Sequence, residues 1–467
     1  MFRLRFQIIV VFILVGGCVR YVPRPIDPPL LEQSYRARGL ADPNLAQFFK
    51  ANFKGGSEAW PPRSMDLEGL TLLALYFSPD LDEVRSRIAA SEAAIITART
   101  KPNPSVLTGA GYSSERGPFA FRSDLEIPFE TAGKRQYRVL RAEQLSQVTR
   151  FSLAETAWGL RSRLRAALVD HLISSRELEQ RSAEVQIRRE IVSIYERRLE
   201  VGETSTPFVT AARTDLSRVQ LEIEQLQGRI TQTRAAIAGV IGLSTPALDN
   251  VQFVLSDLEK PSPEQALNIQ SVQKTGLMNR LDIQRLLAEY AAADSDLRLQ
   301  LARQYPDIAL APVYSSVEGI LVGPGLALPL FDRNRGPIAE ADARRLTAGA
   351  RLLGAQATAI AEMERGLADY RSALRELNQA QATLDLVRQR EQTTEHQLNA
   401  GEVDRLALAS VRLEAAAADR DRLTALRRAH TGLGTLEDAV QHPLPPDTTM
   451  PEPSTTNPRE KKEGTRQ

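Results

Sequence analysis

The sequence predicts a mainly α-helical chain with some β-structure, built from two tandem repeats of a long helical hairpin and a β-hairpin. Three observations support this fold class. Long stretches contain no proline, short segments between them alternate apolar and charged residues, and landmarks of the first half recur about 200 residues later. Because proline in a helix interior costs ~3 kcal/mol, the proline-free stretches at 129–206, 208–245, 264–305 and 338–442 mark where long helices can form.

The N-terminal segment has the form of an export signal followed by a tether. Arg3 and Arg5 precede an apolar run of about ten residues and then small residues, so 1–17 is predicted to be a signal peptide. Val15-Gly16-Gly17-Cys18 resembles a bacterial lipobox, which implies acylation of Cys18, the only Cys of the chain. The alternative is an ordinary signal peptide in which Cys18 is incidental. The proline-rich segment 18–64 is predicted to be a lipidated, extended tether.

Composition excludes several classes of function. The 467 residues carry 59 basic and 58 acidic side chains, a formal net charge of +1, so sequence-independent nucleic-acid binding is not expected. One Cys and four scattered His give no metal-ligand spacing, and no nucleophile and base constellation or phosphate loop is present. The sequence therefore predicts no enzyme, no catalytic residue, no metal site and no cofactor.

The first long helix is expected from Arg135 to Glu200, on the order of 100 Å at 1.5 Å per residue. A turn around Gly202 follows, and then apolar residues recur in steps of three and four. These are Leu216, Val219, Ile223, Leu226, Ile230, Ile237 and Val240. Such a heptad seam requires a helix packed lengthwise alongside, so the simplest structure is an antiparallel hairpin with its tip at Gly202.

The second half repeats the first. Pro104 recurs as Pro306, Pro128 as Pro329, and Gly202-Glu203 as Gly401-Glu402. Landmarks in the same order at near-constant spacing indicate a duplicated unit. We therefore divide the body into repeats at 65–250 and 251–442, the second with a hairpin from about Ile338 to Asn399 and back from Leu406 to about Ala429. The proline-rich, charged segment 443–467 is predicted to be a disordered tail.

Each repeat also contains a predicted β-hairpin. In 119–127 the apolar residues alternate with Arg122, Asp124 and Glu126, a period of two that suits a strand between lipid and water. Its partner is 105–112, and the second repeat offers 308–317 and 320–328. The alternative is that these hairpins are soluble sheets that cap the helices.

The number of strands constrains the assembly. A sheet in a membrane must close, because hydrocarbon offers no hydrogen-bond partners to an open edge. With four strands per chain, a dimer would make a barrel of about eight strands, which side chains fill, whereas a trimer would make twelve and leave a lumen. Arg122, Asp124 and Glu126 would then line that lumen, and the long polar helices would project from the membrane.

The chain from about Met65 to Val440 resembles the TolC-type outer-membrane efflux proteins. The resemblance rests on 78–81 (SPDL), 127–135 (IPFETAGKR) and 328–336 (LPLFDRNRG), together with the two hairpin tips. The first string and 331–336 (FDRNRG) are especially similar to the heavy-metal branch, which serves cobalt, zinc and cadmium or copper and silver efflux. The resemblance implies a homotrimer with a twelve-stranded transmembrane β-barrel in outer-membrane lipid, continued by a periplasmic α-helical barrel.

The resemblance also implies partners and site residues. The chain would be a passive exit duct, joined through a periplasmic adaptor to an inner-membrane pump of the resistance-nodulation-division (RND) type. The adaptor would contact the tips at Val201, Gly202, Glu203, Ala400, Gly401 and Glu402; alternatively, the glycines only permit tight turns. The family's Asp gate positions fall on Ala407 and Ser410, so Asp404 and Arg405 are the candidate gate here, with a solvated turn as the alternative.

Other functions remain open from sequence alone. An adaptor lipoprotein would also have a lipobox and a helical hairpin, but one hairpin and not two. A structural periplasmic coiled coil and an exit duct for drugs or for type I secretion are further alternatives. The substrate is not readable from the residues, and metal cations are expected only from the resemblance.

Overall fold

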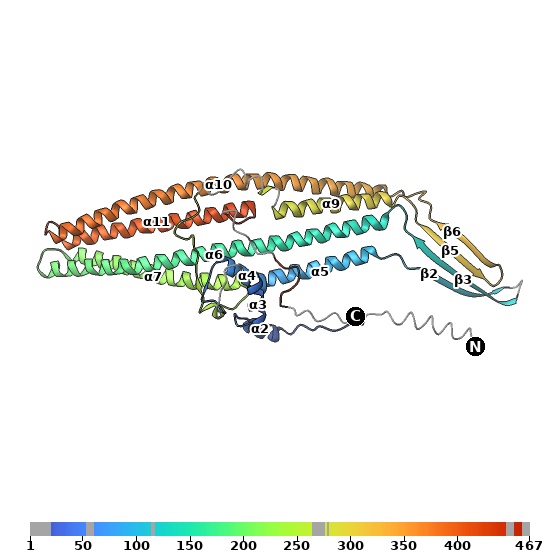
Figure 1. Ribbon diagram of the computed structural model, residues 1–467, viewed down its shortest axis with the longest axis horizontal. Helices are drawn as coiled ribbons and strands as arrows, with labels where there is room; N and C mark the ends of the chain where they lie inside the picture. The colour runs from blue at the N-terminus through green and yellow to red at the C-terminus, as the bar shows by residue number, and fades with distance from the viewer. Residues whose placement is uncertain are drawn as a thin grey trace.

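The protein is a long, narrow molecule with helical hairpin tips at one end and a β-sheet at the other (Figure 1). The structure is a computed structural model and describes residues 20–52, 60–113, 117–263, 276–277, 280–444 and 453–459. Between the two ends, the helices α10, α9, α6 and α5 lie side by side and lead into the strands in the same order (Figure 1).

Both halves of the chain follow the same order of elements. The first half has α5 (Pro79–Arg99), β2 (Ser105–Ser113), β3 (Gly117–Phe129), α6 (Lys134–Glu200) and α7 (Thr206–Ile241). The second has α9 (Leu281–Ala302), β5 (Ile308–Ser315), β6 (Gly319–Leu326), α10 (Arg335–Asn399) and α11 (Arg405–Val440). With 67 residues, α6 is about 100 Å long. The predicted fold class is confirmed, while α11 continues well past the predicted end near Ala429.

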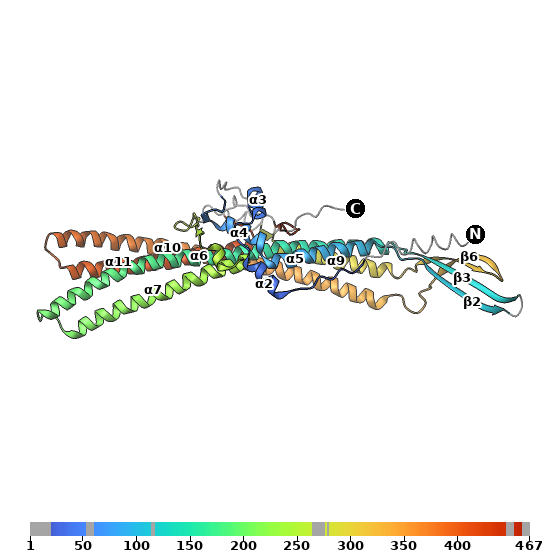
Figure 2. The same ribbon diagram turned by 90° about the horizontal axis from the view of Figure 1, so that it is seen from below.

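Figure 2 shows the two helical hairpins, α6 with α7 and α10 with α11. Apolar seams hold each of them together. Val219 and Ile237 of α7 are buried on the helix that packs along α6, and Leu384 of α10 is buried on the helix that packs along α11. Toward the middle of the molecule α10 and α11 approach closely, because a Cβ on Gly366 would lie 3.2 Å from the Cα of Leu436. Among the described residues, no helix combines the length and apolar character needed to cross a membrane.

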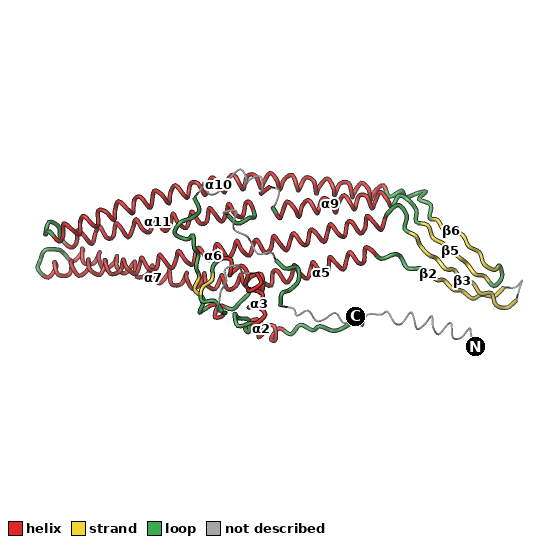
Figure 3. Tube along the Cα trace, viewed as in Figure 1, coloured by secondary structure: helices red, strands yellow, loops and turns green. Residues whose placement is uncertain are grey.

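The sheet has four antiparallel strands in the order β2-β3-β5-β6. The central pair joins the two halves of the chain, since β3 of the first half lies beside β5 of the second with Ile127 opposite Leu310. The strands β2 and β6 are the two edges (Figure 3).

The N-terminal segment differs from the extended tether predicted for 18–64. It forms α2 (Pro28–Arg36) and α3 (Pro43–Asn52), which lie near the middle of the long helices (Figure 1). The prolines were misleading because proline at the first helical positions is favourable, and Asp27 caps α2. Leu45 and Phe49 are buried in the main core with α4 (Leu67–Phe77), and β1 (Ser64–Met65) pairs with β4 (Gln252–Phe253).

Part of the predicted disordered tail is also placed on the body. In 453–459, the carbonyl oxygen of Ser454 accepts a hydrogen bond from Nε of Arg85 at 3.1 Å, and Arg459 pairs with Asp82. The tail is held there because Arg85 of α5 is buried, and the Ser454 carbonyl supplies an acceptor for its Nε–H. The remainder of the tail, 445–452 and 460–467, lies outside the described residues.

Candidate functional site

The two faces of the β-sheet differ in chemistry across all four strands. Directly opposed residues of antiparallel strands project from the same face, so the register assigns every side chain. One face, here called the apolar face, carries Val106, Thr108, Ala110, Phe121, Ser123, Leu125, Ile127, Phe129, Ile308, Leu310, Pro312, Tyr314, Ile320, Val322, Pro324 and Leu326. Most of its large side chains are exposed, including Ile320 at 76% and Val106 at 64%. A band this continuous calls for an apolar environment.

The opposite face, here called the polar face, carries the charged residues of the sheet together with small residues and the apolar Leu107, Val313 and Leu321. Arg122, Asp124 and Glu126 of β3 lie on it, opposite small residues such as Gly109 and Ser315. Nε of Arg122 donates to both carboxylate oxygens of Asp124, at 2.9 and 3.1 Å. The three residues predicted to line a lumen therefore share one face, and Glu126 adds a negative charge beside a neutral pair.

Both hairpin tips close with the same backbone motif. At the first tip, Gly202 N donates to Leu199 O and Glu203 N to Arg198 O. At the second, Gly401 N donates to Leu398 O and Glu402 N to Gln397 O, a Schellman motif in each case. Both glycines have φ near +79°, which requires glycine although an added Cβ would meet no atom within 4 Å.

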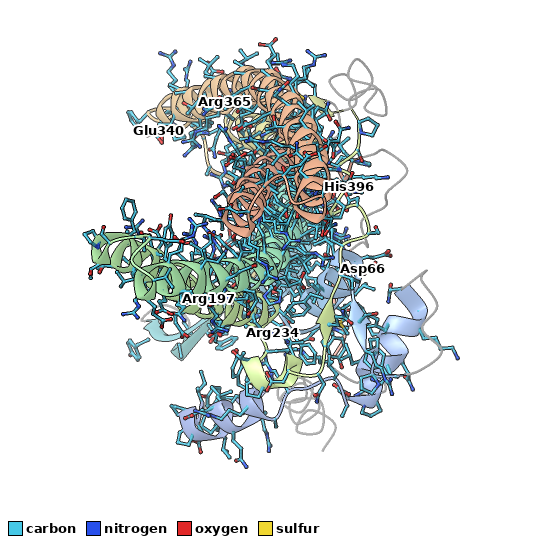
Figure 4. The ribbon with its side chains drawn as sticks, turned by 90° about the vertical axis from the view of Figure 1, so that its left-hand side faces the viewer. Asp66, Arg197, Arg234, Glu340, Arg365 and His396 are labelled. Atoms are coloured by element: carbon cyan, nitrogen blue, oxygen red, sulfur yellow. The ribbon has the colours of Figure 1, made fainter. Side chains whose placement is uncertain are left out.

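The predicted tip residues are all exposed. They are Val201, Gly202 and Glu203 at the first tip and Ala400, Gly401 and Glu402 at the second, and Val201 keeps 69% of its surface exposed. Figure 4 looks along the molecule from this end, with Arg197 on the first hairpin and His396 on the second. The tips therefore present a free surface on which another molecule could dock.

Asp404 connects the two tips. Its Oδ1 accepts from Ala407 N at 2.8 Å and caps α11, while its Oδ2 lies 2.6 Å from Nη2 of Arg198 on α6. The Ala407 N–H and the Arg198 guanidinium hold the pKa of Asp404 below its usual value. We call the Arg198–Asp404 contact the tip bridge. Arg405, the other candidate gate residue, is exposed and has no ion pair among the described residues.

A polar seam follows the tip bridge along α6 and α11. Glu184 of α6 is 1% exposed and accepts from Arg181 at 2.7 Å, Arg188 at 2.8 Å and Arg420 of α11 at 2.7 Å. Burial opposes ionisation of Glu184, but the three guanidiniums outweigh it and hold its pKa below the usual value. Ion pairs thus join the two hairpins to each other here, and closer to the middle an apolar cluster of Val169 and Ile173 on α6 with Leu423 and Leu426 on α11 joins them as well.

The seam ends near the middle of the molecule in a fully buried cluster. Oε2 of Glu437 on α11 lies 2.9 Å from Arg161 and 3.3 Å from Arg165, both on α6 and all three almost completely buried. Nearby, Nε2–H of His430 donates to Leu258 O at 2.8 Å, and burial lowers the pKa of His430. Removing one partner of a buried ion pair is strongly destabilising, so this end of the polar seam is more stable than the exposed end at the tip bridge.

Some predicted sites lie outside what the structure describes, and some contacts were not predicted. Cys18 lies outside the described residues. Arg198 and Glu184 escaped notice because their partners are 206 and 236 residues away, although the N-cap position of Asp404 was a readable signal. Within the described parts of the chain, no group of three or more His, Cys, Asp or Glu is placed to hold a metal ion.

Comparison with known proteins relates the chain to membrane channels. Residues 71–243 match the model of the outer membrane efflux protein family. The cobalt-zinc-cadmium resistance protein CzcC of Cupriavidus metallidurans is 24% identical over 278 residues, 58% of this chain and 65% of that protein, just under two thirds of its length. The outer membrane protein VceC of Vibrio cholerae has a TM-score of 0.65 at 18% identity, covering 80% of this chain and 95% of VceC. The channel CusC gives 0.65 at 17% identity, covering 83% and 96%.

Proposed function

We propose, from its similarity to the outer membrane efflux proteins, that this chain is the outer-membrane channel subunit of a tripartite efflux system. One observation carries the proposal. The four strands present one continuous apolar face, their charged side chains lie on the other face, and β3 and β6 lead into α6 and α10, each about 100 Å long. Such a sheet suits a barrel wall between lipid and water, and such helices suit a duct that crosses the compartment behind it.

The chain would act as a homotrimer in the outer membrane. Two unpaired edges per chain are incompatible with hydrocarbon, so the sheet must close through other copies. Three copies supply twelve strands, enough to leave a lumen lined by Arg122, Asp124 and Glu126, whereas about eight strands would be plugged. The helices would lie in the periplasm.

The hairpin tips are the proposed docking surface for a periplasmic adaptor. They are exposed, carry a pair of acidic residues in Glu203 and Glu402, and lie at the end of the molecule farthest from the sheet (Figure 1). An adaptor bound there would connect the duct to an inner-membrane pump of the RND type, which would supply the energy. The duct itself needs no catalytic residue.

The tip bridge is the proposed gate element. It is the exposed end of the polar seam, whose other end at Glu437 is almost fully buried, so the second hairpin can separate from the first at its tip while the middle stays packed. An adaptor that competes for Arg198 or Asp404 would favour the open arrangement.

The proposed substrates are divalent metal cations. The support is similarity to a protein named for cobalt, zinc and cadmium resistance. A duct for drugs or for type I secretion is the competing function, since the described residues offer no metal site to distinguish them. Metal tolerance of cells that lack the gene, compared with their tolerance to drugs, decides between these substrates.

Cys18 is the proposed site of acylation, which would hold the N-terminus at the membrane. Acyl chains contribute ~0.8 kcal/mol per buried methylene, so two or three chains give a stable anchor. Labelling by a fatty-acid probe in wild type and its loss in Cys18→Ala support the anchor. Undiminished labelling of the variant refutes it.

The oligomer mass and the planar-bilayer conductance of the detergent-extracted protein test the function. We expect a trimer that inserts and conducts. A water-soluble monomer that never conducts refutes the channel and favours an adaptor or a structural coiled coil.

A further inference from the structure

The two edge strands of the sheet lack neighbours, and the structure contains a template for what pairs with them. The proposed trimer closes β6 of one subunit onto β2 of the next, so this inference rests on the proposed function. The template is the internal seam, at which β3 and α6 of the first half meet β5 and α9 of the second.

The internal seam has a defined register and a defined joint. Ile127 lies opposite Leu310 and Phe129 opposite Ile308. Where the strands pass into helices, Nζ of Lys134 donates to Tyr305 O at 2.6 Å and to Oδ1 of Asp307 at 2.7 Å. Lys134 is thereby 8% exposed although it is charged.

The two halves of the chain are equivalent at this joint, residue by residue. Gly133 and Asn334 both have a left-handed backbone, with φ of +74° and +59°, and both immediately precede a long helix. They are 201 residues apart, as are Pro128 and Pro329, whereas Pro104 and Pro306 are 202 apart. Arg335 is therefore the counterpart of Lys134.

We propose that neighbouring subunits join through a seam that copies the internal one. The counterpart of Ile127 lies 201 residues later, at Leu328, and the counterpart of Leu310 lies 202 residues earlier, at position 108. Because Ile127 pairs with Leu310, the proposed seam pairs Leu328 with Thr108 of the partner subunit. The antiparallel register then sets Leu326 opposite Ala110 of the partner subunit and Leu330 opposite the partner's Val106. The strand β6 thus extends through Leu330 once a neighbour is present.

The faces of the sheet support this register. A slip of one residue moves every side chain of a strand to the other face. In the proposed register Leu326 meets Ala110 of the partner subunit, and both belong to the apolar face. One residue of slip would oppose Leu326 to Gly111 of the partner subunit on the polar face and break the apolar band at each of the three seams.

Unpartnered side chains at the open edge support the same conclusion. Leu328 and Leu330 are 62% and 67% exposed, and Arg335 is exposed without an ion pair among the described residues. In the proposed seam Arg335 takes the place of Lys134 and donates to the carbonyl oxygen of the partner's Asn103. The position equivalent to Asp307 is occupied by Ser105 of the partner subunit, which carries no charge. The acidic side chain of the proposed seam is instead Asp332, on the same subunit as Arg335.

Cysteine pairs in the full-length, detergent-extracted protein test the register. Opposed residues have Cα atoms about 4.5–5.5 Å apart, which a disulfide spans, whereas a two-residue offset along strands that rise ~3.3 Å per residue exceeds ~7 Å. We expect Leu326→Cys with Ala110→Cys to give mostly covalent dimers and trimers after oxidation. Leu326→Cys with Thr108→Cys is the matched control and should give at least fivefold less. The single variants, which retain Cys18, should give none.

Each outcome decides a different claim. Equal or stronger crosslinking of the Thr108→Cys pair, or no crosslinking of the Ala110→Cys pair in a protein that has trimer mass, overturns the register and leaves the channel intact. A monomer mass for the wild-type protein refutes both.

A second measurement needs no disulfide. Arg335→Ala should lower the temperature at which the trimer dissociates in detergent, Arg335→Lys should restore it, and Arg333→Ala, an exposed neighbour, should not change it. Equal effects of the Arg333 and Arg335 substitutions contradict the proposed joint.

Discussion

Removal of the tip bridge should raise the open probability of the channel. Asp404→Asn is the informative substitution, because Asn caps a helix as well as Asp and leaves the bond to Ala407 N intact. Only the charge that faces Arg198 disappears. Arg198→Gln removes the same pair from the other side.

The magnitude follows from the exposure of the pair. With side chains 33% and 53% exposed, the bridge is well screened and contributes roughly 0.5–1 kcal/mol. If the three bridges of a trimer break together on opening, they contribute about 1.5–3 kcal/mol, and each 1.4 kcal/mol is a factor of ten. The open population should therefore rise about tenfold to a hundredfold.

Single-channel recording in planar bilayers measures this directly. Asp404→Asn and Arg198→Gln should raise the open probability alike, and the double variant should add little, because both remove one interaction. Arg197→Gln is the matched control, since Arg197 is an exposed neighbour whose guanidinium, within the described part of the chain, donates to the Ser193 carbonyl and to no carboxylate. An unchanged open probability in both single variants, or an equal rise in the control, refutes the gate.

Four further outcomes are expected. The tip bridge should not respond to pH between 5 and 8. Because the pKa of Asp404 is lowered, the contribution of the bridge is present above the ordinary carboxyl value of about 3.9 and is lost only as pH falls through the lowered value. A steep change in open probability between pH 5 and 8 contradicts this. Glu184→Gln should destabilise the trimer to heat by about 3 kcal/mol, because Arg181, Arg188 and Arg420 all lose the buried carboxylate that they share. The exposed Glu179→Gln should change stability by less than about 0.5 kcal/mol, and equal melting of the two variants would show that the polar seam contributes nothing. The deficit of Glu184→Gln should shrink as pH falls through the lowered pKa of Glu184, since the wild-type carboxylate is then protonated. Gly202→Asp and Gly401→Asp should abolish efflux while trimers persist, because they add a negative charge to the docking surface. The matching Asn variants, which accept the same positive φ without that charge, should retain part of the activity. Full resistance of cells with either Asp variant counts against docking at that tip.

Local physics made most of the architecture predictable. Proline exclusion, heptad spacing and alternation are properties of neighbouring residues, so they located α6 to within one residue and placed Arg122, Asp124 and Glu126 on one face. The tip glycines were readable because a helix that turns back needs a residue with positive φ.

Contacts between distant segments were not predictable in this way. The tip bridge joins residues 206 positions apart, and neither Arg198 nor Asp404 stands out among 117 charged side chains, 59 basic and 58 acidic. The N-terminal helices were missed because their prolines suggested extended chain, while the burial of Leu45 and Phe49 depends on a surface assembled from α4 and other distant elements. The helix α11 continues past the predicted end near Ala429 because its last turns are buried against distant residues, as where Gly432 allows close packing against Tyr370.

The lipid exposure of the two sheet faces tests the central claim most directly. Tryptophan introduced at Leu125 on the apolar face and at Val313 on the polar face can be read against the two native tryptophans, Trp60 and Trp158, which lie outside the sheet. In reconstituted vesicles, brominated acyl chains should quench the residue at position 125 and aqueous iodide the residue at position 313. Quenching of both positions by iodide alone would contradict a membrane-spanning wall and with it the channel.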